Sequence, residues 1–216
     1  MPALPMEQPR LEARGRDDFM VSASNSDAVA LLDRWPDWPD KRLALVGPEG
    51  SGKSHLAAIW ADEVGAQILP ALDLRADAAV DLAAGPLVIE DADRGVDETA
   101  LFHLWNAGAA AGQRLLLTGR TRPAAWPVEL PDLRSRLASL TPANIEEPDD
   151  TLLSVLLLKL FADRQLRVKP ALIGYLLPRM ERSFRAAAEM VDRLDRVSLE
   201  RGVPLNRDLA KDLLGG

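Results

Sequence analysis

The sequence predicts an α/β domain built on a parallel sheet, followed by a small all-helical domain. Short apolar runs alternate with segments of helical periodicity over roughly the first 140 residues, which is the pattern of a parallel sheet covered by helices. Beyond Pro142 the pattern becomes purely helical. A glycine-rich phosphate-binding loop follows the first apolar run and precedes a helical pattern, as that motif requires.

We divide the chain into three parts: a flexible N-terminal arm (1–18), a nucleotide-binding α/β domain (19–142) and a helical lid domain (143–216). The arm carries three prolines and scattered charges without periodicity. In the α/β domain we expect strands at 43–46, 66–69, 86–89 and 114–118, helices at 26–35, 54–63 and 98–111, and a weak helix or loop at 74–82. In the lid domain we expect helices at 149–165, 169–180, 183–201 and 206–214, with Pro178 ending or kinking the second.

Composition narrows the class of protein. A chain of 216 residues with 47% hydrophobic content can bury a proper core. The absence of cysteine excludes disulfides, thiolate metal sites and cysteine nucleophiles. No apolar run approaches the roughly 20 residues that span a bilayer, and no signal peptide is evident, so we expect a cytoplasmic protein without a membrane partner. The net charge of −7 argues against a broad DNA-binding surface and for contact with DNA only through other proteins.

The phosphate-binding loop is complete: Gly47–Ser54 reads G-x-x-x-x-G-K-[ST]. Glycines let backbone N–H groups converge on a polyphosphate, and the following helix adds its positive N-terminal dipole. Lys53 is expected to reach the outer phosphates and Ser54 to ligate Mg²⁺. The expected nucleotide-binding residues here are Gly47, Pro48, Glu49, Gly50, Ser51, Gly52, Lys53, Ser54 and the adjacent His55.

A pair of carboxylates follows the apolar run at 86–89. Glu90 and Asp91 stand where that strand should end, and ligands of open parallel sheets bind at this edge. In a phosphate-loop protein, one carboxylate (Glu90) would position Mg²⁺ and the other (Asp91) would orient the water that attacks the γ-phosphate. A solvated strand end is the plainer alternative for the pair alone.

Several segments resemble the AAA+ domains of the DnaA/Hda family of replication initiators and their shorter regulatory relatives. The similar stretches are Asp18–Asn25, Gly50–Leu56, Leu101–Ala107, Gly112–Gly119, Leu130–Leu137 and Arg182–Met190. The resemblance implies an AAA+ P-loop fold that binds ATP or ADP with Mg²⁺. It further implies that Asn25 belongs to the segment against the adenine, that Arg136 is an arginine finger, and that Arg185 is the lid arginine that points at the nucleotide.

The same resemblance implies a function and partners. It favours a regulator that promotes hydrolysis of DnaA-bound ATP. Gln8 and Leu11 of the arm are either a peptide that docks on the DNA polymerase sliding clamp or part of a plain tail. The chain stops at Gly216, where initiators continue into a DNA-binding domain, and this favours the regulator. Homo-oligomerisation stays open.

Two departures from the family pattern bear on activity. The acidic pair begins with Glu90 where relatives usually have Asp, so weak intrinsic hydrolysis is expected. Arg120 follows Thr118-Gly119, where the family commonly has an acidic residue. Two other functions stay open: a DnaC-like helicase loader, which should bind single-stranded DNA, and a small-molecule kinase, which should need no macromolecular partner.

Overall fold

The structure is a computed structural model and describes residues 19–215. The predicted arm, together with Gln8 and Leu11, lies outside the described residues.

A five-stranded parallel sheet forms the centre of the α/β part. Its strands are β1 (Arg42–Val46), β2 (Gln67–Pro70), β3 (Leu87–Glu90), β4 (Leu115–Gly119) and β5 (Pro142–Asn144), in the order β2-β3-β4-β1-β5. All the pairings are parallel, as predicted. The central strands are almost uninterrupted apolar runs because helices bury both of their faces. Val46 pairs with Gly119 and Ile89 with Leu117, so these strands end together at one edge.

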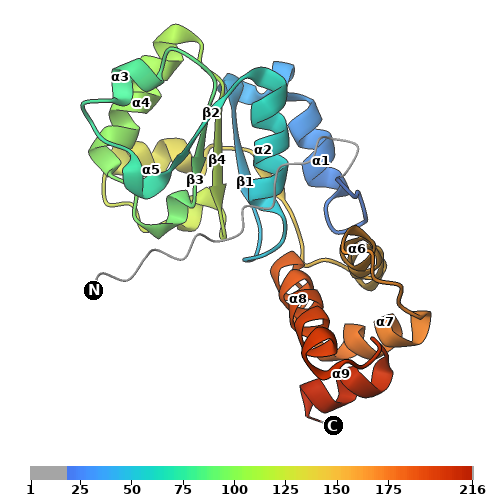
Figure 1. The fold of residues 1–216 in the computed structure, drawn as a ribbon. Helices are drawn as coiled ribbons and strands as arrows, with labels where there is room; N and C mark the ends of the chain where they lie inside the picture. The colour runs from blue at the N-terminus through green and yellow to red at the C-terminus, as the bar shows by residue number, and fades with distance from the viewer. Residues whose placement is uncertain (1–18, 216) are drawn as a thin grey trace, which may run out of the picture.

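Helices cover the two faces of the sheet in separate layers (Figure 1). On one face lie α1 (Ser26–Asp33) and α2 (Lys53–Val64), whose core includes Leu32, Trp60 and, from β1, Leu43 and Leu45. On the other lie α3 (Ala79–Leu82), α4 (Glu98–Ala111) and α5 (Pro131–Ala138), whose core includes Leu104 and Leu133.

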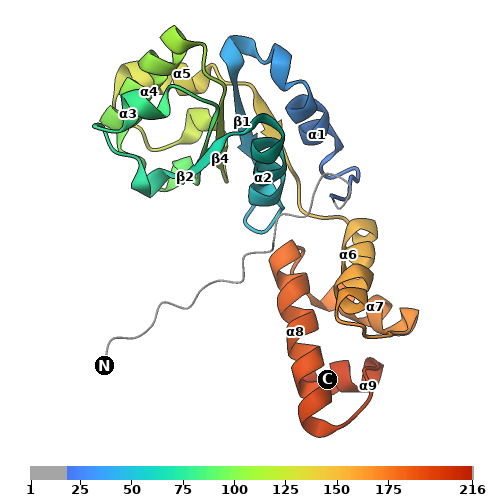
Figure 2. The ribbon, with the colours of Figure 1, turned by 45° about the horizontal axis from the view of Figure 1, so that its top comes forward.

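The C-terminal part is helical and has a core of its own. It consists of α6 (Asp150–Asp163), α7 (Pro170–Leu176), α8 (Phe184–Arg201) and α9 (Arg207–Leu214). Figure 2 shows these helices gathered below the sheet, with α8 reaching up towards the start of α2. Leu157, Phe161 and Leu194 are fully buried among them. Side-chain caps mark three of the four N-termini: Asp149, Ser183 and Asn206 accept bonds from the first turns of α6, α8 and α9.

Some elements differ from the sequence prediction. The segment beyond Pro142 is not purely helical, because Pro142–Asn144 forms edge strand β5 and pairs with Ala44–Val46. The strand was not predicted because it is short and begins with a proline, a residue that is depleted in strands but tolerated at a sheet edge. The proposed boundary at 143 falls within this strand. Helix α5 was not predicted, although Leu133 and Leu137 carry a four-residue apolar spacing behind Pro131 at the first helical position.

The remaining boundaries shift by a few residues. The first helix ends at Asp33, and Trp35–Asp37 forms a 3₁₀ turn because a residue before proline disfavours helical geometry. Helix α7 gives way at Leu177 to a 3₁₀ turn that contains Pro178, as expected. Within residues 19–215 no helix combines the length and the apolar character that a membrane crossing demands.

Candidate nucleotide-binding site

The phosphate loop connects β1 to α2 and takes a shape that requires glycine. Gly50 and Gly52 have φ angles of +73° and +96°, in the left-handed region that other residues rarely adopt. At Gly47 a Cβ atom would lie 2.4 Å from the backbone oxygen of Ile145. The loop is therefore pressed against the chain that follows β5, and its backbone N–H groups continue into the free N-terminal turn of α2.

Lys53 is a buried cation held by neutral oxygens. Its side chain is 7% exposed, and Nζ donates to the carbonyl oxygens of Gly47 and Pro48, both at 2.7 Å. Burial lowers the pKa of Lys53, while the nearby carboxylates of Asp91 and Asp93 oppose that change. Within the described residues no carboxylate forms an ion pair with this ammonium group. A buried cation without a partner charge is suited to receive an anionic phosphate.

The hydroxyl groups of the loop fit the same ligand. Ser51 Oγ is buried and has no hydrogen-bond partner within the part of the chain that the structure describes. Ser54 is exposed in the first turn of α2, where a metal ion beside the phosphates would meet its hydroxyl. These groups and the loop glycines fit a nucleotide phosphate.

The acidic pair lies at the end of β3, beside the end of β4. Asp91 has a φ of 54°, and its N–H donates to Thr118 Oγ1 at 3.0 Å. Its carboxylate pairs with Arg94 at 3.5 Å, while Glu90 is half-buried as the last residue of β3. Among the described residues no three acidic, histidine or cysteine side chains form a metal site by themselves. Mg²⁺ takes few protein ligands at nucleotide sites, so Ser54 and Glu90 fit it only as ligands shared with the phosphates.

The start of α8 sits directly on the phosphate loop. The N–H of Phe184 donates to the Gly50 carbonyl at 2.8 Å, and Arg185 Nη1 pairs with Glu49 Oε1 at 2.8 Å. A Cβ at Gly50 would lie 2.7 Å from Ser183 Cβ. Arg185 and Glu49 are 136 residues apart in the sequence, and the fold brings them together at the loop.

Three of the predicted residues have other surroundings. Asn25 is buried, where its side chain bonds to the backbone of Ser22 and Met20 and holds the turn before α1. The ring of His55 meets Phe19 edge to face at 5.5 Å. Arg136 belongs to α5, on the sheet face away from α2.

Sequence reasoning missed Arg94, and it flagged Arg120 only as a departure. Arg94 Nη2 lies 3.4 Å from Glu49 Oε2, and Arg120 Nη1 lies 3.9 Å from the same oxygen. The signal for Arg94 is weak, because one arginine three residues after Asp91 is common on any surface turn. Only the convergence of three chain segments reveals that both arginines face the loop.

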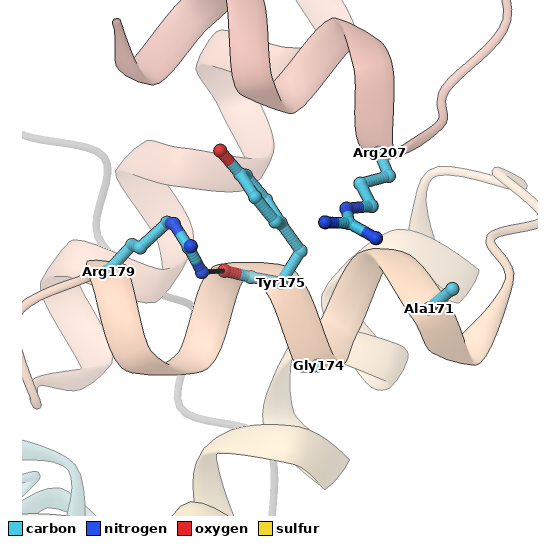
Figure 3. A pocket seen from close by; sticks show the side chains of 5 residues that line it. All are labelled: Ala171, Gly174, Tyr175, Arg179 and Arg207. Carbon is cyan, nitrogen blue, oxygen red and sulfur yellow. Dashed lines mark hydrogen bonds between the residues drawn. The ribbon is translucent and has the colours of Figure 1, made fainter. Parts of the chain in front are cut away.

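A separate hollow of about 330 Å³ lies on the helical part (Figure 3). Ala171, Gly174, Tyr175, Arg179 and Arg207 line it. The Tyr175 ring stands between the two arginines, whose guanidinium carbons lie 4.0 Å (Arg179) and 5.3 Å (Arg207) from its centroid. Its lining comes from α7, the turn that follows it and α9, and includes no residue of the phosphate loop.

The fold and loop together define a P-loop α/β protein with a helical lid. Among solved structures, domain III of DnaA from Thermotoga maritima superposes with a TM-score of 0.76 at 18% identity, covering 92% of this chain and 94% of that one. AMPPCP-bound DnaA from Aquifex aeolicus gives a TM-score of 0.71 at 16% identity, with 85% and 65% covered. The T. maritima RuvB Holliday junction branch migration motor gives 0.66 at 18%, with 85% and 63% covered. The chain has the AAA+ fold of DnaA.

Sequence comparison adds less. The chain is 32% identical over 126 residues to an uncharacterized protein of Haemophilus influenzae, an alignment that covers 54% of this chain and 51% of that protein. The chain therefore spans about half the length of this curated relative. No family model matches the chain.

Proposed function

We propose that the protein is a nucleotide-dependent AAA+ regulator of chromosome replication initiation. In this proposal it promotes hydrolysis of ATP bound to DnaA, acting together with the DNA polymerase sliding clamp. The observation that carries the proposal is the position of Arg136 on α5, which packs on the opposite face of the sheet from α2, the helix that follows the phosphate loop.

The surroundings of Arg136 suit a residue that acts on a neighbouring molecule. Nη1 donates to Asn106 Oδ1 at 2.6 Å, and the guanidinium carbon lies 5.0 Å from the Phe102 ring centroid. Among the described residues no carboxylate neutralises it. An oriented arginine can stabilise the charge that develops in phosphoryl transfer, and it often does so across a subunit boundary.

The protein's own ATP or ADP, with Mg²⁺, has a structural part in this proposal. The contacts of Phe184 and Arg185 with the loop support a nucleotide that holds the sheet and the helical part in one arrangement. Intrinsic hydrolysis is weak because Glu90 is one methylene longer than aspartate and the Asp91 carboxylate is shared with Arg94. Clamp docking through Gln8 and Leu11, a cytoplasmic location and any homo-oligomer belong to the same proposal.

The test is hydrolysis of DnaA-bound ATP, with and without this protein and DNA-loaded clamp. Arg136→Ala should abolish the stimulation, since an arginine finger contributes on the order of 10³-fold or more to the rate. Arg134→Ala is the matched control, because Arg134 is an exposed residue of the same helix. Full stimulation by Arg136→Ala would disprove the finger.

The other outcomes separate the alternatives. Stimulation that needs Arg136 but not the clamp would remove Gln8 and Leu11 from the proposal. Without stimulation under any condition, a strongly salt-dependent affinity for single-stranded DNA would identify a DnaC-like loader. Turnover of a small phosphate acceptor without any macromolecule would identify a kinase.

A further inference from the structure

Three arginines from three separate segments converge on one carboxylate of the phosphate loop. Arg94 comes from the turn after β3, Arg120 from the end of β4 and Arg185 from the first turn of α8. Their nitrogens lie 3.4, 3.9 and 2.8 Å from the oxygens of Glu49. All three side chains approach the same carboxylate, so Glu49 is the point that they share.

This cluster belongs electrostatically to the phosphate site. Arg94 and Glu49 both act on the pKa of Lys53, Arg94 lowering it and Glu49 raising it. The first turn of α8 also approaches the loop, because Phe184 donates to Gly50. A polyphosphate on the backbone N–H groups of the loop would therefore extend its outer charge into the field of these arginines.

Other acidic groups also face the arginines, but each arginine is only partly engaged. Asp91 lies 3.5 Å from Arg94, Asp93 lies 3.6 Å from Arg120, and Glu189 lies 3.9 Å from Arg185. The three arginine side chains are between 36% and 56% exposed. Since a guanidinium carries five N–H donors, most donors in the cluster stay open to a further anion.

We propose that Arg94 and Arg120 join Arg185, the expected nucleotide-facing arginine, in an outer-phosphate site for a nucleoside triphosphate, and that Glu49 fills this site as an internal ligand until the phosphate displaces it. The proposal rests on the nucleotide binding proposed above. A terminal phosphate suits the cluster better than Glu49 does, because it offers three oxygens to the planar forks of several arginines. The cluster consequently binds a triphosphate more tightly than a diphosphate. The competition from Glu49 sets the size of this difference in affinity.

The experiment is calorimetric titration of the purified protein with AMPPCP and with ADP, each with Mg²⁺. Glu49→Gln keeps the size of the side chain and removes its charge, so AMPPCP should bind about five- to tenfold more tightly, with a smaller gain for ADP. Arg94→Gln and Arg120→Gln should weaken AMPPCP more than ADP. Glu181→Gln is the charge-matched control, because Glu181 forms no ion pair among the described residues.

The outcomes distinguish the two proposals. Wild type that binds neither nucleotide would overturn both, and Lys53→Ala shows whether any binding seen occurs at the loop. If wild type binds through Lys53 but Glu49→Gln changes neither affinity, the internal-ligand proposal alone fails. Equal losses for AMPPCP and ADP in the arginine variants would overturn the outer-phosphate site while leaving nucleotide binding intact.

Discussion

At the scale of single residues, the site is governed by charges that the fold has partly removed from water. Lys53 is buried, and this burial lowers its pKa below the ordinary value of a lysine, while its Nζ donates to the carbonyl oxygens of Gly47 and Pro48. A bound phosphate would favour the charged form and raise that pKa again. The proposed nucleotide binding would therefore be linked to the protonation of Lys53.

The linkage predicts a pH dependence. At a pH below the lowered pKa, Lys53 is already charged and the affinity for nucleotide is at its maximum. At a pH above it, Lys53 must take up a proton when nucleotide binds, so this affinity falls by up to about tenfold per pH unit. We expect this fall to begin at a lower pH than an ordinary lysine would give. Lys53→Arg stays charged and should lack the fall. The check is titration of both proteins with ADP between neutral and alkaline pH; parallel curves would contradict the linkage.

At the scale of elements, the phosphate loop and the start of α8 are in direct contact. Gly50 takes part twice, through its carbonyl, which accepts from Phe184, and through its missing Cβ, which leaves room for Ser183 at the N-terminus of α8. Any side chain on Gly50 must push the helix away.

Gly50→Ala and Gly65→Ala form a matched pair that tests this contact. The φ angles are +73° and +68°, so each alanine costs about 1–2 kcal/mol of backbone strain. At Gly65 a Cβ has no atom within 4 Å, whereas at Gly50 it meets Ser183 at 2.7 Å. Both variants should lose stability, Gly50→Ala the more because of this clash, but only Gly50→Ala should weaken nucleotide binding, by about tenfold or more. Equal affinities in the two variants would show that the lid contact is unimportant.

At the scale of the whole molecule, the sheet and the helical part have separate cores. The cores on the two faces of the sheet share no residue with the core of α6 to α9. The loop contacts of α8 and the chain after β5 join them, so local unfolding of the helical part need not open the sheet.

The variant Phe161→Ala tests whether the helical part can unfold while the sheet stays folded. Phe161 is fully buried among the lid helices, and its truncation should cost that part about 3–5 kcal/mol. Hydrogen exchange should then accelerate in α6 to α9 while β1, β3 and β4 keep their protection. Leu158→Ala, on the same helix but 45% exposed, is the control and should change little. Equal loss of protection in the sheet would mean that the two parts unfold as one unit.

The local patterns of the sequence determined the parallel α/β architecture, the helical C-terminal part and the loop Gly47–Ser54. Apolar periodicity and a contiguous glycine motif are carried by neighbouring residues, so they can be read without knowing the fold. Strand β5 and helix α5 were not predicted, because the formation of short elements depends on pairing and packing partners more than on their own sequence pattern.

Tertiary structure alone decided the electrostatic surroundings of the loop. Glu49, Arg94, Arg120 and Arg185 come from four segments and meet only because β3 and β4 end beside the loop and α8 returns to it. It likewise placed Arg136 on the sheet face opposite α2. Charges act through space over a few ångströms, and the sequence does not record which distant residues the fold brings within that range.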